Sequence, residues 1–472
     1  MSVFQRQIIK GSLSNFAGIG LGVLNNIWIF PLAFSLEELG IYRWVERTAV
    51  LIAAIALFGL HRMYVRFQSR FSEDQASQFL SNTVFLVACL AIVSGVLFTA
   101  FAPWLATLLE VNFQGSQLRA LGAVVAGSMT YTLGLSVASS AKRISVPFFF
   151  KNVGIRLSLL IGAWMVSQGN ATFGFWMQLL AYTHLAVGIV VLIYALKLKG
   201  IPLRWPRSLG ESMTQELAAF AGSGILMAVM TMSLATIDSQ MIASLMSMEA
   251  LGIYSIAFFI GSFVDGIRRP ISQALSPQFA NLWNEGNTDA IAKMYARTSR
   301  VLMAVAIVSF VVIVPNIDFI FGLIPDPDRF EPAKSVVILI LLSRVIDYSF
   351  GSNGEILSNG PHFKWNLVAI SGLVVAIIGL NLWLIPVYGL DGAGFTLVIA
   401  YAIFNTIKAI YLWHKERIQP FGTAQLLLLV IGAITFIVAF LTSGEGIVAL
   451  LITNAIIAIG LLVGFLTLRS KI

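Results

Sequence analysis

Ionisable side chains inside long apolar stretches are the residues of this sequence best suited to chemistry. At a bilayer centre each costs about 2.5 to 3.5 kcal/mol, so such a residue usually faces a cavity or a partner. Arg156 lies roughly 16 Å from one end of its stretch at about 1.5 Å per helical residue. Because a guanidinium binds phosphate oxygens bidentately and keeps its charge, we predict that Arg156 contacts an anionic substrate. A buried structural ion pair is the alternative.

Three more charged residues share one helical face near the start of another stretch. Arg43, Glu46 and Arg47 are three and four residues apart, which brings them together on an α-helix. Arg43 and Arg47 are predicted substrate contacts, and Glu46 is a predicted ion-coupling site. Alternatively, the two arginines extend to the membrane surface while Glu46 pairs with Arg43. Lys151, in the same stretch as Arg156, is a further predicted substrate contact.

Two carboxylates, Asp238 and Asp265, have no basic neighbour one helical turn away within the apolar part of their stretches. Burial disfavours the charged form of a carboxylate, so such a group suits reversible protonation. Both are predicted ion-coupling sites. Asp238 is the stronger candidate, because Asp265 can instead interact with Arg268 and Arg269 at the membrane surface.

Arg344 and Asp347 lie one turn apart in a later stretch. Arg344 is a predicted substrate contact and Asp347 a predicted ion-coupling site. The alternative is that the two side chains neutralise each other.

The elements that must position these residues are membrane-spanning helices. Of 472 residues, 58% are hydrophobic and only 11% are charged, against roughly 25% charged in a soluble domain. A helix needs about 20 apolar residues to span a bilayer. The predicted fold class is therefore an all-α integral membrane protein with about fourteen spans. They lie near residues 12–34, 41–60, 81–103, 119–140, 145–166, 173–195, 217–245, 251–267, 299–322, 334–354, 365–386, 390–412, 421–442 and 446–468.

Basic residues collect on alternate loops, which indicates the cytoplasmic side of a multi-pass protein. That side holds Arg6, Lys10, Arg62, Arg66, Arg70, Lys142, Arg143, Lys197, Lys199, Arg204, Arg207, Arg268, Arg269, Lys293, Arg297, Lys364, Lys408, Lys415, Arg417, Arg469 and Lys471. The opposite loops hold Glu37, Glu38, Glu110, Glu249, Asp318, Asp326, Asp328, Asp391 and Glu445, with only Arg329 and Lys334 as basic residues. The alternation predicts an even number of spans, fourteen or else twelve, with both termini in the cytoplasm.

An internal repeat divides the chain. Residues 35–42 (SLEELGIY) recur as residues 247–254 (SMEALGIY), with six of eight positions identical. Six spans is an even number, so the two halves keep one orientation and can enclose a central cavity. We predict an N-terminal six-helix lobe (1–200), a cytoplasmic linker (201–216), a C-terminal six-helix lobe (217–415) and two additional helices (416–472).

Several short motifs carry a family resemblance. Residues 238–242 (DSQMI) and 276–280 (SPQFA) flank the second copy of the repeat, and residues 316–322 (NIDFIFG) and 385–394 (IPVYGLDGAG) follow. In this order they resemble the O-antigen and exopolysaccharide flippases of the multidrug, oligosaccharidyl-lipid and polysaccharide exporter superfamily. The resemblance covers most of the chain and implies two six-helix lobes with alternating access.

That resemblance implies transport of a polyprenyl-pyrophosphate-linked oligosaccharide across the bacterial cytoplasmic membrane, with the bilayer and other polysaccharide assembly proteins as partners. It also implies that the two extra helices help to form a groove open to lipid. An ion-coupled drug or organic-cation antiporter of the same superfamily is the first alternative, and it predicts a mainly acidic cavity. A non-transporting membrane enzyme of polysaccharide assembly is the second.

Motifs of catalysis and cofactor binding are absent from the sequence. There is no Gly-x-x-x-x-Gly-Lys phosphate loop, His-Glu-x-x-His or Cys-x-x-Cys motif. Asp326 and Asp328 have an Asp-x-Asp spacing, but they fall in a short loop typical of a turn. The sequence therefore predicts no enzyme, no cofactor and no metal site, and its basic residues are too dispersed to predict nucleic-acid binding.

Overall fold

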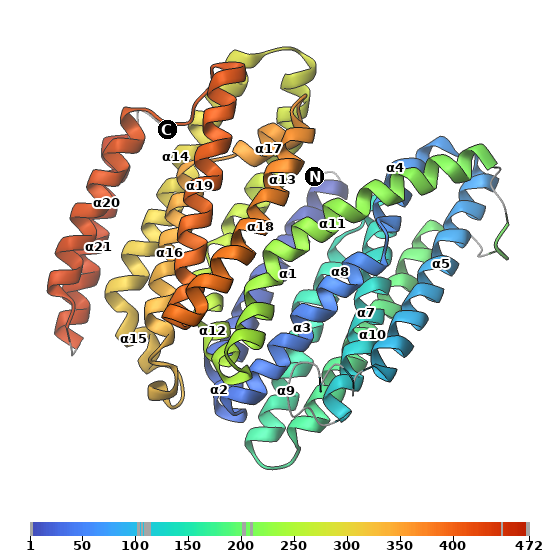
Figure 1. Ribbon diagram of the computed structural model, residues 1–472, viewed down its shortest axis with the longest axis horizontal. Helices are drawn as coiled ribbons and strands as arrows, with labels where there is room; N and C mark the ends of the chain where they lie inside the picture. The colour runs from blue at the N-terminus through green and yellow to red at the C-terminus, as the bar shows by residue number, and fades with distance from the viewer. Residues whose placement is uncertain are drawn as a thin grey trace. The chain divides into compact units, whose positions relative to one another are not determined.

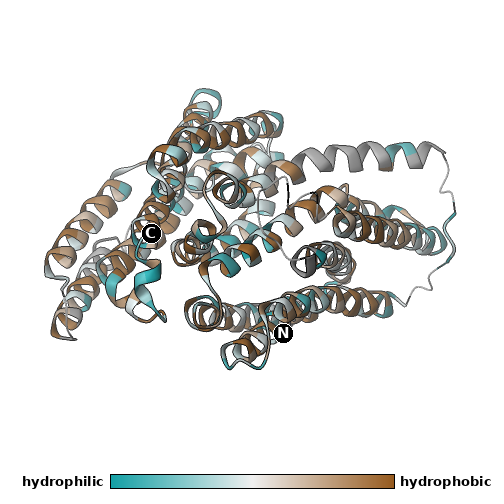
Figure 2. Ribbon diagram, turned by 60° about the horizontal axis from the view of Figure 1, so that its bottom comes forward, coloured by the Kyte–Doolittle hydropathy of each residue, from teal (hydrophilic) through white to brown (hydrophobic). Residues whose placement is uncertain are grey.

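The computed structural model describes residues 3–101, 104, 107, 115–200, 204–207, 211–444 and 447–468, which form helices joined by short turns (Figure 1). Hydrophobic residues predominate along these helices (Figure 2). Backbone within lipid must satisfy its own hydrogen bonds, and a helix does so. Among the described residues, nine helices are long and apolar enough to cross a membrane, or up to eleven if each of two bent pairs is one span. The predicted class, an all-α multi-pass membrane protein, is confirmed, whereas the count of fourteen spans stays a prediction.

The chain forms two compact units, Met1–Gly252 and Ile253–Ile472. The first contains α1 (Val3–Val23), η1 (Leu24–Ile29), α2 (Phe30–Ala33), α3 (Leu36–Ala56), α4 (Leu60–Phe67), η2 (Gln68–Arg70), α5 (Glu73–Ala100), α7 (Gly115–Ser140), α8 (Ser145–Phe149), η3 (Phe150–Gly154), α9 (Ile155–Ser167), α10 (Phe173–Lys199) and α11 (Glu211–Leu245). Helix α12 (Met248–Gly261) begins in the first unit and continues into the second. The second contains α13 (Asp265–Asn284), α14 (Thr288–Ile313), η4 (Val314–Asn316), α15 (Ile317–Gly322), η5 (Pro327–Phe330), α16 (Ala333–Ser349), α17 (Asn353–Ser358), α18 (Phe363–Tyr388), α19 (Leu390–Glu416), α20 (Thr423–Thr442) and α21 (Ile447–Leu468).

The structure differs from the sequence-based expectations at several places; for example, Arg268 and Arg269, assigned above to a loop, lie on α13. Helix α11 starts at Glu211, so residues 211–216 of the predicted linker are helical. Lys408, assigned above to a loop, is instead buried within α19. The predicted loop residues Glu110, Glu445, Arg469 and Lys471 lie outside the described residues. The predicted lobes stay a prediction.

A sharp bend follows α3. The helix begins in a capping box, where the Ser35 backbone donates to Glu38 Oε2 (2.9 Å) and the Glu38 backbone donates to Ser35 Oγ (3.2 Å). It ends where Phe58 and Gly59 take positive φ angles of 47° and 69°, which a continuous α-helix cannot accommodate. Helix α4 therefore leaves at 50° to α3, and a similar bend of 57° separates α12 from α13.

The two copies of the repeated motif contact each other. The backbone carbonyl of Met248 occupies the place where a Cβ on Gly40 would stand, and that of Leu36 occupies the corresponding place at Gly252. Each copy thus presents its Gly to the second residue of the other copy. Only glycine permits so close an approach of two backbones.

Glycines also bring α7 and α10 into the most extensive helix contact of the first unit. A Cβ on Gly127 would lie 2.5 Å from the backbone carbonyl of His184, and one on Gly188 would lie 2.5 Å from the carbonyl oxygen of Gly127. Small residues at such crossings allow van der Waals packing, which drives helix association in lipid.

We expect Gly127→Ala to destabilise the protein by about 1–3 kcal/mol, because the added methyl group overlaps rigid backbone atoms. Thermal unfolding in detergent, followed by intrinsic fluorescence, measures the change. Gly372→Ala on α18 is the matched control, since nothing lies within 4 Å of its Cβ position. A Gly127→Ala protein as stable as the control would contradict the close packing of α7 and α10.

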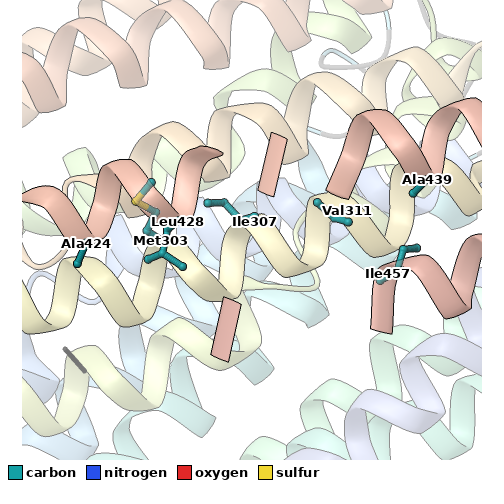
Figure 3. Close-up of a cluster of buried hydrophobic side chains, with 7 residues drawn as sticks. All are labelled: Met303, Ile307, Val311, Ala424, Leu428, Ala439 and Ile457. Atoms are coloured by element: carbon teal, nitrogen blue, oxygen red, sulfur yellow. The ribbon is translucent and has the colours of Figure 1, made fainter. Parts of the chain in front are cut away.

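The C-terminal helices pack on α14. Met303, Ile307 and Val311 of α14 form a buried cluster with residues of α20 and α21, namely Ala424, Leu428, Ala439 and Ile457 (Figure 3). This cluster joins α20 and α21 to the rest of the second unit.

Candidate functional site

Two π-helical segments lie against each other in the first unit. Segment η1 interrupts the first span after α1, and η3 lies between α8 and α9. The Asn25 side chain donates to the Arg156 carbonyl (2.9 Å), and the Arg156 guanidinium donates to the Gly18 carbonyl. Segments of π-helix are rare and frequently mark functional sites. Arg156 is therefore held at the contact between the first and fifth predicted spans.

Arg43 links α3 to the same region. Its Nη1 lies 2.9 Å from Glu46 Oε2, with 14% and 32% of the two side chains exposed. Its second amino group donates to Asn26 Oδ1, and the Asn26 amide donates to the Gly22 carbonyl (2.6 Å). The pairing of Glu46 with Arg43, one of the alternatives drawn from the sequence, is confirmed.

The charges around Glu46 are predominantly positive. Glu46 interacts electrostatically with Arg43, Arg47 and Arg156. Three guanidinium groups thus lie near one carboxylate, and positive charge exceeds negative within this set, which we call the arginine cluster. Half-buried positive charge attracts an anion more strongly than exposed charge does, because water screens it less. The arginine cluster therefore carries net positive charge.

The first unit contains two more predicted residues, Lys151 on η3 and Asp238 on α11. Lys151, on η3, is exposed and places its Nζ 5.0 Å from the centroid of the Tyr131 ring. Asp238 is buried on α11. The neighbouring Gln240 donates to Thr48 of α3 (2.9 Å), so α11 is fixed against the helix that carries Arg43.

In the second unit, four charges pair between α13 and α16. Arg344 Nε lies 3.1 Å from Asp265 Oδ1, and Arg268 pairs with Asp347. Tyr348 donates to Asp265 Oδ1 (2.5 Å). Arg344 and Asp347 therefore find their ion-pair partners on another helix instead of neutralising each other along α16. Asp265 forms its ion pair with Arg344 of α16, while Arg268, its alternative partner from the sequence, pairs with Asp347 and interacts with Asp265 electrostatically.

A chain of buried amides extends from this set. Asn405 donates to Asp347 Oδ1 (2.8 Å), and Asn353 donates to Asn405 Oδ1 (2.9 Å). Lys408, with 6% of its surface exposed, interacts electrostatically with Asp347 and Glu355. Sequence reasoning missed Asn353, Asn405 and Glu355. The asparagines could have been found from the sequence as amides within apolar stretches, because a buried amide requires hydrogen-bond partners.

The structure thus assembles the sequence-predicted residues into two sets, one in each unit. Arg43, Glu46, Arg47 and Arg156 meet in the first, and Asp265, Arg344 and Asp347 meet in the second. Their roles in substrate binding and ion coupling stay predictions. Across the residues that the structure describes, no group of three or more His, Cys, Asp or Glu side chains is placed to hold a metal ion.

The fold is shared with known membrane transporters. A structure of the lipid II flippase MurJ in an inward closed conformation matches with a TM-score of 0.76, covering 98% of this chain and 99% of that chain at 13% identity. A multidrug resistance MATE family transporter of the MOP superfamily, in an inward-facing conformation, matches with a TM-score of 0.66, covering 86% of this chain and 94% of that chain at 13% identity. At these identities the similarity concerns the fold.

The sequence itself identifies a family. No protein with a curated function matches it. The family described as polysaccharide biosynthesis protein matches residues 34–323, which is more than half of the chain. This range contains the arginine cluster residues Arg43, Arg47 and Arg156 and the repeated motif. The chain therefore belongs to the polysaccharide biosynthesis protein family.

Proposed function

We propose that this protein is a flippase that moves a polyprenyl-pyrophosphate-linked oligosaccharide across the bacterial cytoplasmic membrane by alternating access. The product would serve the synthesis of cell-surface polysaccharide such as O-antigen or exopolysaccharide. The observation that carries this proposal is the arginine cluster, which supplies positive charge for a diphosphate within a membrane-embedded unit.

Family and fold support the same conclusion. The family concerns polysaccharide biosynthesis, and the fold resembles that of a flippase for a lipid-linked precursor and of a drug transporter. Both point to a transporter in preference to a catalytic enzyme. The alternation of basic loops supports a cytoplasmic location for both termini under the positive-inside rule. Other proteins of polysaccharide assembly are proposed partners.

Within this proposal, Arg156, Arg43 and Arg47 bind the diphosphate. Lys151 and Arg344 supply further positive charge to the substrate. Carboxylates at Asp238, Asp265, Glu46 and Asp347 are the proposed ion-coupling sites. The ion pairs of Glu46, Asp265 and Asp347 mean that coupling at these three would require the pairs to open.

The multidrug transporter fold makes a cation antiporter the rival function. An organic cation is attracted by carboxylates and repelled by guanidinium groups. Three arginines around Glu46 favour an anionic substrate over a cationic one.

Transbilayer movement of a fluorescent polyprenyl-diphosphate oligosaccharide, measured in proteoliposomes, tests the proposal. We expect movement by the wild type and a several-fold slower rate for Arg156→Ala. Arg156→Lys should be intermediate, since lysine keeps the charge but loses the bidentate geometry. Arg62→Ala is the matched control, because Arg62 is an exposed arginine on α4.

Thermal unfolding of each variant separates substrate binding from a purely structural role of Arg156. If Arg62→Ala and Arg156→Ala slow transbilayer movement of the lipid equally, the arginine cluster has no specific role in transport. If the wild type leaves the lipid in place and instead exports organic cations against a proton gradient, the flippase proposal is wrong and the antiporter is correct.

A further inference from the structure

Residues 204–207 form an extended segment attached to the side of α5. Three polar residues of α5 hold its backbone: Gln78, Ser81 and Asn82. Spacings of three and four residues place all three on one face of the helix. We call residues 204–207 the linker strap.

Both the carbonyl and the N–H groups of the strap backbone bind side chains of α5. Gln78 donates to the Trp205 carbonyl (3.0 Å), and Asn82 donates to the Arg207 carbonyl (2.6 Å). The Arg204 backbone donates to Ser81 Oγ (2.9 Å), and the Arg207 backbone donates to Asn82 Oδ1 (3.2 Å). Four such bonds fix the backbone and leave the side chains free to face outward.

The side chains that face outward are aromatic and basic. Trp205 is 80% exposed, although a tryptophan ring buries favourably. Its ring lies 5.9 Å from that of Phe85, which is itself exposed on the apolar part of α5. Arg204 pairs with Asp74, whereas the exposed Arg207 side chain makes no hydrogen bond or ion pair within the described chain.

The position of the strap along α5 corresponds to a membrane surface. The candidate span Asp74–Ala100 has 27 residues, so it is about 40 Å long and roughly 10 Å longer than the hydrocarbon core. Its first turns, which carry Gln78 and Ser81, therefore fit the headgroup layer. Tryptophan is enriched at this depth, where one part of the ring is apolar and its N–H is hydrated.

We propose that the linker strap is an interfacial anchor, with the Trp205 ring between lipid headgroups and the Arg207 guanidinium on the phosphate of an anionic phospholipid. Charge complementarity selects the lipid class, since a basic residue near the membrane surface is attracted to anionic headgroups. The anchor would hold the predicted linker at the bilayer surface. It depends only on membrane insertion, so it can hold or fail independently of flippase activity.

The depth of Trp205 is measurable by fluorescence quenching in vesicles of phosphatidylcholine brominated either near the headgroup or near the middle of the acyl chain. The difference between wild type and Trp205→Phe isolates the Trp205 signal. We expect stronger quenching by bromine near the headgroup. Trp164→Phe, which removes a half-exposed tryptophan on α9, is the matched control. A Trp205 signal that neither lipid quenches would overturn the anchor.

Lipid selectivity is tested by native mass spectrometry of the full chain with phosphatidylglycerol and phosphatidylcholine. We expect Arg207→Gln to reduce phosphatidylglycerol retention several-fold, while Lys142→Gln, which alters another exposed basic residue, has little effect. Equal retention by the two variants would overturn the assignment of Arg207.

The double variant Ser81→Ala, Asn82→Ala removes three of the four attaching hydrogen bonds without altering Trp205. We expect it to spread the quenching of Trp205 over both lipid depths. Unchanged depth selectivity in this variant would contradict a role of α5 in holding the anchor.

Discussion

Arg344→Leu is expected to destabilise the second unit by about 3 kcal/mol, because it removes the ion-pair partner of the largely buried Asp265 carboxylate. Arg344 is 8% exposed and Asp265 is 24% exposed. The Arg344 N–H is not aligned for a hydrogen bond, so the 3.1 Å contact with Asp265 is an ionic one. Thermal and denaturant unfolding in detergent would measure the loss.

A double variant supplies the control. Arg344→Leu combined with Asp265→Leu removes both charges, so it should recover much of the stability lost in the single variant. Tyr348 loses its acceptor in that protein, which keeps the recovery incomplete. If the double variant is as unstable as the sum of the two single variants, the pair does not interact as the structure indicates.

Arg43→Leu is the second change with a large expected effect, about 3 kcal/mol. It leaves both Glu46 and the buried Asn26 amide without the group that joins α3 to η1. Unfolding should therefore begin in the first unit, and cysteine labelling of Cys89 on α5 as a function of temperature can detect it.

Glu46→Gln provides the comparison for Arg43→Leu, because glutamine keeps an acceptor for Arg43 while removing the carboxylate charge. A smaller loss is expected for it. Arg62→Leu, on the exposed face of α4, should change stability by less than about 0.5 kcal/mol. A loss in Arg43→Leu no larger than that in Arg62→Leu would show that the Arg43 contacts contribute nothing.

The positions of the helices could be predicted because lipid imposes a simple rule on sequence. Backbone in lipid favours helix, and an apolar stretch such as 173–195, which lies within α10, is helical. An ion pair within one turn of a helix could also be predicted, as for Arg43 and Glu46. Interactions within a single turn of helix depend on spacing alone.

Interactions between helices could not be predicted in the same way. Arg344 and Asp347 are three residues apart and suggested one pair, yet each meets a residue of α13. The partner is set by tertiary packing, which a single sequence does not show. The π-helical segments η1 and η3 were equally hidden, because one additional residue in a turn has no compositional signal.

The glycine contacts between α7 and α10 restrict how the first unit can change shape. Backbones that touch at Gly127 and Gly188 cannot slide or rotate past each other without atomic overlap. The two helices must therefore move as a single rigid body. Under the proposed alternating access, movement within this unit would come from the helices beside that body, where the turns of η1 and η3 depart from regular α-helical hydrogen bonding.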